Sequence, residues 1–67
     1  MTFSKNVRTK VVANVEYKMN AVYTDKSEHP TYCISRWENG KKIDYVVQNV
    51  GKDTIEMVWQ DTVEKML

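Results

Sequence analysis

The residues best suited to chemistry lie in the middle of the chain. They are one histidine, one cysteine and three carboxylates: Asp25, Glu28, His29, Cys33 and Asp44. A cysteine nucleophile needs a base such as histidine within hydrogen-bond reach, and a third group that orients the base. Here His29 belongs to a polar stretch typical of an exposed loop, whereas Cys33 follows an alternating apolar pattern, in which a lone cysteine packs as a small hydrophobic side chain. We therefore expect no catalytic residues and no enzymatic activity.

The same residues do not predict a metal site. Asp25, Glu28, His29 and Cys33 lack the ligand spacing of known zinc or calcium motifs. No glycine-rich phosphate loop or other cofactor motif occurs in the chain. We expect neither a metal nor a cofactor, so the function has to come from the fold and its surfaces.

Size and cysteine content define the broad class. The 67 residues form one small domain, near the lower limit for a fold without disulfides or metal. With one cysteine, a disulfide could form only in a homodimer bridged through Cys33, and a reducing, cytoplasmic location is expected. The apolar runs are far too short for a membrane span or a signal peptide, so no membrane partner is expected.

The charge balance is close to neutral. Ten lysine and arginine residues stand against nine aspartate and glutamate residues, for a net charge of +1. This is too little for strong, non-specific attraction to a phosphate backbone. Any binding of nucleic acid would need a local cluster of cations.

The pair Asn39-Gly40 predicts a tight hairpin, because both residue types accept the positive φ angles of a type I′ turn. A two-residue loop fixes the register, with Glu38 opposite Lys41 and Trp37 opposite Lys42. Continued without a break, this register gives two faces. The predicted core face carries Tyr32, Ile34, Ile43, Tyr45 and Val47, with Arg36 at its rim. The predicted mixed face carries Cys33, Ser35, Trp37, Lys42, Asp44 and Val46.

Residues 54–60 alternate between apolar and polar types and predict a further antiparallel strand. Ile55, Met57 and Trp59 would then extend the core face. Asp61 and Glu64 have the spacing of a capping box, which predicts a last helical turn containing Met66 and Leu67.

Residues 7–23 fit both a helix and a strand. Apolar residues recur every four positions, but the odd positions are free of charge and the segment is rich in valine and tyrosine, which favours a strand. Such a long segment would either bend or turn back near residues 18–20. The fold class is therefore mainly β: a small antiparallel sheet or an SH3-like or OB-like barrel of about four to five strands, with a short C-terminal helical turn. The alternative is α+β, an N-terminal helix on a three-stranded antiparallel meander.

The mixed face suggests a site for a protein partner. Trp37, Lys42, Val46, Val58 and Cys33 would be neighbours across three strands, and Lys42 would lie over the Trp37 ring. An aromatic anchor with a flanking cation and a polar rim is typical of a protein-binding hot spot. We expect a small non-enzymatic binding module, an inhibitor or adaptor of the kind encoded by phages and mobile elements.

The alternative function is binding of single-stranded nucleic acid. Arg36, Trp37, Lys41 and Lys42 cluster at the hairpin tip, and small β-barrels bind single strands with sheet aromatics and cations. Two features oppose this reading in the uninterrupted register. The tyrosines of the hairpin, Tyr32 and Tyr45, fall on the core face, and two carboxylates, Glu38 and Asp44, interrupt the cations.

Overall fold

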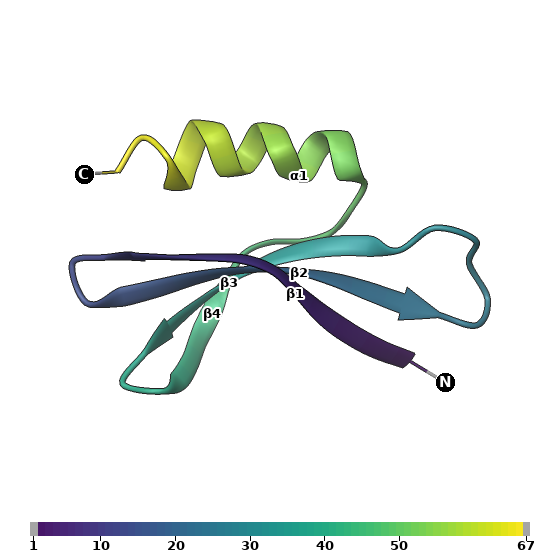
Figure 1. Cartoon of the computed structure of the whole chain (residues 1–67), viewed down its shortest axis with the longest axis horizontal. Helices are drawn as coiled ribbons and strands as arrows, with labels where there is room; N and C mark the ends of the chain where they lie inside the picture. Colours follow the sequence, from purple (N-terminus) through teal and green to yellow (C-terminus); the bar gives the residue numbers. More distant parts are fainter. Residues whose placement is uncertain (1, 67) are drawn as a thin grey trace.

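The computed structural model describes residues 2–66, which form one antiparallel sheet with a helical segment over one of its faces (Figure 1). The strands lie side by side in chain order: β1 (Thr2–Val12), β2 (Val15–Thr24), β3 (Thr31–Glu38) and β4 (Lys41–Val50). The helical segment consists of α1 (Lys52–Val58) and η1 (Trp59–Val63). The predicted mainly β fold with a C-terminal helix is confirmed, as an open sheet rather than a barrel. The alternative with an N-terminal helix is wrong, because residues 2–24 form the first hairpin.

The first hairpin turns at Ala13 and Asn14, where the backbone has φ angles of 51° and 69°. Val12 and Val15 face each other across this two-residue turn. The turn predicted near residues 18–20 is wrong, since that stretch continues through the middle of β2. Positive φ at both turn residues gives the type I′ geometry that matches the twist of the strands. Asparagine accepts this conformation readily, whereas alanine gives no such signal in the sequence.

The second hairpin turns at Asn39-Gly40, as predicted, and its first two pairs are Glu38 with Lys41 and Trp37 with Lys42. Beyond them the predicted register is wrong, because β4 contains bulges. An extra residue at Ile43 puts Asp44 opposite Arg36 and Tyr45 opposite Ser35. Further shifts put Val47 opposite Ile34 and Val50 opposite Tyr32.

The first bulge exchanges the faces of two side chains in β4. An extra residue inverts the side-chain alternation that follows it. Tyr45 therefore joins the face of Trp37, and Asp44 joins the opposite face. Ile43, predicted to be core, is 51% exposed.

The predicted strand at residues 54–60 is wrong, because this segment is helical. Ile55, Trp59 and Val63 recur every four residues, and each is at most 1% exposed. Met57, predicted to share the core face with Ile55 and Trp59, points away from the sheet and is 59% exposed. Gly51 is the N-cap of α1. The predicted cap at Asp61 is also wrong, since Asp61 lies inside η1. Leu67, expected in the last turn, lies outside the described residues.

The core lies between the helical segment and the two central strands. Tyr17 and Met19 of β2 and Ile34 of β3 pack against three helical side chains, Ile55, Trp59 and Val63. The odd positions of β2 form this layer, as the period-two pattern predicted. Within residues 2–66 no helix has the length and apolar character needed to cross a membrane.

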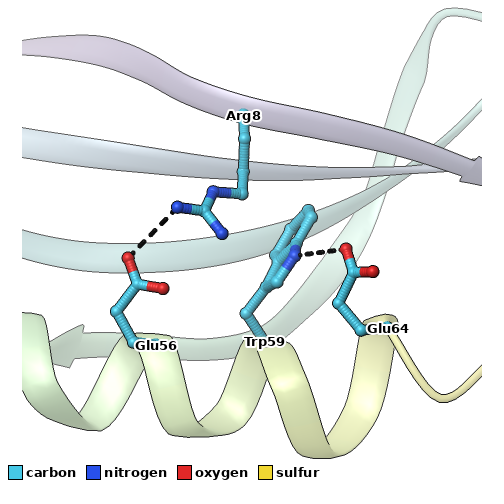
Figure 2. A network of polar contacts seen from close by, with 4 residues as sticks. All are labelled: Arg8, Glu56, Trp59 and Glu64. Carbon is cyan, nitrogen blue, oxygen red and sulfur yellow. Dashed lines mark hydrogen bonds and ion pairs between the residues drawn. The ribbon is translucent and has the colours of Figure 1, made fainter.

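Polar contacts attach the helical segment to β1, at the edge of the sheet (Figure 2). Arg8 forms an ion pair with Glu56 at 3.3 Å, and its guanidinium group lies 5.7 Å from the centre of the Trp59 ring. The Trp59 indole N–H donates to Oε1 of Glu64 at 2.8 Å. Lys10 forms a further ion pair with Glu64 at 3.3 Å. Arg8 and Lys10 of β1 thus pair with Glu56 and Glu64 of the helical segment.

Candidate binding surfaces

The sheet has one covered face and one open face. We call the open face the side opposite α1 and η1, against which no helix or strand of residues 2–66 packs. Its position follows from the register. Glu16, Lys18 and Asn20 of β2 alternate with the core residues, and they face Trp37, Ser35 and Cys33 of β3. A half-covered antiparallel sheet of this kind is common, and its second face contacts solvent or a ligand.

Two aromatic side chains with two lysines form a cluster on the open face. The Nζ of Lys18 lies 4.2 Å from the centre of the Trp37 ring. The Nζ of Lys42 lies 4.5 Å from the centre of the Tyr45 ring and donates to the Tyr45 hydroxyl at 2.7 Å. We call Lys18, Trp37, Lys42 and Tyr45 the aromatic-lysine cluster. The predicted stacking of Lys42 on Trp37 is wrong, because each lysine lies over a different ring.

Trp37 is held by a bond to a buried neighbour. Its indole N–H donates to the hydroxyl of Ser35 at 2.8 Å. Ser35 is only 2% exposed and lies two positions before Trp37 on the same face. The indole orientation is thus fixed by a hydrogen bond, while the ring itself stays half-buried. A rigid aromatic side chain of this kind loses little entropy when it contacts a ligand.

Cys33 shares the open face but is only 8% exposed. Burial raises the pKa of its thiol, because the thiolate is disfavoured away from water. Cys33 is therefore a packed, protonated side chain at neutral pH, and it offers little area to a partner.

The predicted members of the protein-binding site other than Cys33 do not all lie on one face of the sheet. Trp37 and Lys42 face each other as predicted. Val58 lies in α1, on the covered side of the sheet, because the segment expected to be a strand is a helix. Val46 packs against the core cluster. The apolar part of the predicted site is therefore smaller on the open face than the sequence indicated.

The predicted nucleic-acid residues are divided between the two faces. Trp37 and Lys42 lie on the open face, whereas Arg36 and Lys41 alternate with them and belong to the covered face. Both oxygens of Asp44 accept hydrogen bonds from the Arg36 guanidinium group. This pairing lowers the pKa of Asp44 and removes its charge from the neighbourhood of Trp37.

Sequence reasoning missed Lys18 and Tyr45. The alternation in residues 15–23 puts Lys18 on the face opposite the core residues. The pairing of Lys18 with Ser35 of β3 would then have placed it near Trp37. The face of Tyr45 depends on the bulge at Ile43, for which the sequence carries no glycine or other marker.

The candidate catalytic residues do not form a common site. His29 lies in the exposed connection between β2 and β3, whereas Cys33 is buried in β3. Within residues 2–66 no group of three or more His, Cys, Asp or Glu side chains is arranged to hold a metal ion.

Comparison with known proteins identifies no relative: no protein-family model, no curated protein and no solved structure matches the chain. Function must therefore be inferred from the surfaces of this molecule.

Proposed function

We propose that the protein binds single-stranded nucleic acid through the open face of its sheet. The observation that supports this is the aromatic-lysine cluster, in which two rings and two ammonium groups share one uncovered face. Single strands bind by stacking bases on aromatic side chains while cations contact the phosphates, and such stacking contributes roughly 1–3 kcal/mol per base.

The bulge in β4 weakens the two features that opposed this function in the predicted register. It moves Tyr45 to the open face and Asp44 to the covered face, whereas Tyr32 stays on the covered face and Glu38 keeps its predicted position. Tyr45 lies diagonally from Trp37 across β3 and β4, since it faces Ser35. Diagonal neighbours in a sheet lie about 7–8 Å apart, so two bases of one strand can reach both rings. Asp44 and Glu38 alternate with the cluster and belong to the other face.

A bound nucleotide can offer a new partner to both the ring and the ammonium group of each aromatic-lysine pair. In the free protein each ammonium group lies over a ring. When a base stacks on the ring, the displaced ammonium group can contact a phosphate of the same strand. The exchange leaves neither the ring nor the charge without a partner.

The register gives the open face a small excess of positive charge. Lys18 and Lys42 lie there with the carboxylate of Glu16, whereas Glu38 and Asp44 belong to the covered face. Glu16, opposite Trp37, is the carboxylate nearest the cluster in the register. Asn6 and Asn20 hydrogen-bond to each other at 3.1 Å on the same face, and their amides can bond the edges of unpaired bases.

The direct test is the fluorescence anisotropy of labelled single-stranded DNA and RNA oligonucleotides. We expect affinity to fall with salt, with a slope of roughly −0.7 per contacted phosphate. The double variant Lys18→Gln/Lys42→Gln should weaken binding and flatten that slope. Lys26→Gln/Lys65→Gln removes the same charge from exposed positions outside the cluster and should bind like the wild type.

A second series tests the rings. Trp37→Ala and Tyr45→Ala should each weaken binding by about 5- to 100-fold, which corresponds to one lost stacking contact. Trp37→Phe keeps a ring and should retain most of the affinity, and Met57→Ala is the control for an exposed apolar side chain outside the cluster. Equal losses in the cluster and control variants would argue against the proposed site.

A protein partner is the second candidate, supported by the exposure of Ile43. This residue is 51% exposed at the first bulge of β4, directly after Lys42. Together with Trp37 it offers an aromatic and an aliphatic anchor to an apolar surface. In this case Ile43→Ser and Trp37→Ala should both abolish capture of the partner, and binding should change little with salt. An inhibitor or adaptor would act in this way.

A further inference from the structure

A second candidate site lies on the covered side of the sheet, beside the start of α1. The structure has a cleft there with a volume of about 490 Å³, within the range of sites for small organic ligands. Its walls come from β1, β2, β3 and α1. The lining residues that bear on a ligand are Lys5, Arg8, Tyr23, Tyr32, Lys52 and Glu56.

The cleft is positively charged. Lys5, Arg8 and Lys52 line it from two elements that are far apart in the sequence, against a single carboxylate, Glu56. Arg8 is paired with Glu56. Lys5 and Lys52 make no ion pair within residues 2–66, so two positive charges have no counter-ion there.

The cleft also has an aromatic wall. Tyr23 and Tyr32 supply two rings with hydroxyl groups. The Tyr23 ring is supported by Phe3, whose ring stacks on it with centres 4.9 Å apart. A ligand in the cleft can therefore place a ring or sugar against the tyrosines and an anionic group between the lysines.

We propose that this cleft binds a phosphomonoester attached to a ring, of the nucleoside 5′-monophosphate class. A phosphomonoester carries about −1.5 to −2 charges at pH 7, which matches the two lysines that lack a carboxylate partner. A carboxylate would neutralise only one of them. The Arg8 guanidinium group donates one hydrogen bond to Glu56 and keeps other N–H groups for a phosphate oxygen. This site lies across the sheet from the aromatic-lysine cluster and does not depend on the function proposed for that cluster.

The test is a titration followed by two-dimensional ¹H–¹⁵N NMR spectra at low salt, with adenosine 5′-monophosphate, adenosine and inorganic phosphate as separate probes. We expect adenosine 5′-monophosphate to bind most tightly and to shift the signals of residues that line the cleft. Binding of adenosine as tight as that of its monophosphate would overturn the proposal. So would shifts centred on Trp37 and Tyr45, or no saturable shift at all.

Charge variants make the test specific. Lys5→Gln/Lys52→Gln should lower the affinity for the monophosphate by about tenfold or more, because charge-assisted hydrogen bonds are lost. Lys5→Arg/Lys52→Arg keeps both charges and should restore binding. Lys26→Gln/Lys65→Gln is the matched control and should leave the affinity within about twofold. All these lysines are exposed, and spectral dispersion reports whether each variant is folded. Equal weakening by the control would overturn the site.

The phosphomonoester can come from a free nucleotide or from the 5′ end of a nucleic-acid strand. A short oligonucleotide with and without a 5′-phosphate separates the two sources. The cleft binds strand ends if the phosphorylated strand binds more tightly than the free monophosphate and if Lys5→Gln/Lys52→Gln removes this difference in affinity. Weaker binding of the strand would assign it to the free nucleotide.

Discussion

At the scale of single residues, Glu64 has the most connected side chain of the helical segment. It accepts a hydrogen bond from Trp59 and one from Lys10. The Glu64 N–H also bonds to the carbonyl of Trp59 at 2.9 Å, the i to i+5 pattern of a π turn. In an α-helix two residues five apart point to different sides, whereas the π turn brings Glu64 over Trp59 (Figure 2). The wider turn therefore lets one carboxylate bond a core indole and a lysine of β1.

These contacts make the contribution of Glu64 to stability dependent on pH. The hydrogen bond from Trp59, and then that from Lys10, lower the pKa of Glu64 below its ordinary value of 4.5. As pH falls, the carboxylate of Glu64 therefore takes up a proton more readily in the unfolded chain than in the folded protein. The contribution is therefore complete above the unfolded pKa and is lost as pH falls through the folded pKa.

Glu64→Gln keeps an acceptor for Trp59 but removes the charge. In urea unfolding we expect the variant to be less stable than the wild type at pH 7, with a difference that shrinks towards zero as pH falls below about 4. Asp61→Asn changes a nearby carboxylate that lies 3.9 Å from a single lysine, and it is the control. A difference between wild type and Glu64→Gln that stays constant from pH 7 to pH 3 would contradict this account.

At the scale of elements, the first hairpin contains a local conflict between sequence and conformation. Ala13 has a φ of 51°, a left-handed conformation that costs alanine roughly 1–2 kcal/mol. Asparagine accepts it more easily. We expect Ala13→Asn to raise the free energy of unfolding by about 0.5–1 kcal/mol, measured from urea midpoints. Asn14→Ala, with φ at 69°, should lower it by a similar amount. No change in either variant would mean that the turn differs in solution.

The elements that the sequence predicted are those with local signals. Asn39-Gly40 carries its turn in its own residue types, and the alternation of residues 15–23 marks the covered face of β2. The bulges of β4 depend on packing between strands, so residues 43–50 shifted face without a local sign. One of these shifts puts Tyr45 on the open face, which changes the composition of the candidate site.

The C-terminal segment fits two periods, which is why the predicted strand at residues 54–60 is wrong. Ile55, Met57 and Trp59 alternate as in a strand, while Ile55, Trp59 and Val63 repeat as on one helix face. A short window does not separate the two patterns. The four-stranded sheet favours the helix, because one apolar face of the sheet has to be covered and a helix buries three large side chains there.

At the scale of the whole molecule, a small core leaves little reserve of stability. A single core in a chain of 67 residues rarely supplies more than about 3–5 kcal/mol. Ile55 is fully buried between the helical segment and the sheet. Truncating a buried isoleucine to alanine costs about 2–5 kcal/mol, so one such change removes most of the stability.

The pair Ile55→Ala and Met57→Ala tests how the helical segment covers the sheet. We expect Ile55→Ala to be largely unfolded at 25 °C, by circular dichroism and by the loss of NMR dispersion. Met57 is 59% exposed, and Met57→Ala should change the free energy of unfolding by less than about 0.5 kcal/mol. A strand at residues 54–60 would bury both side chains on one face, and both variants would then lose several kcal/mol. Comparable losses in the two variants would therefore reject the helical cover, and with it the assignment of Trp37 and Tyr45 to an uncovered face.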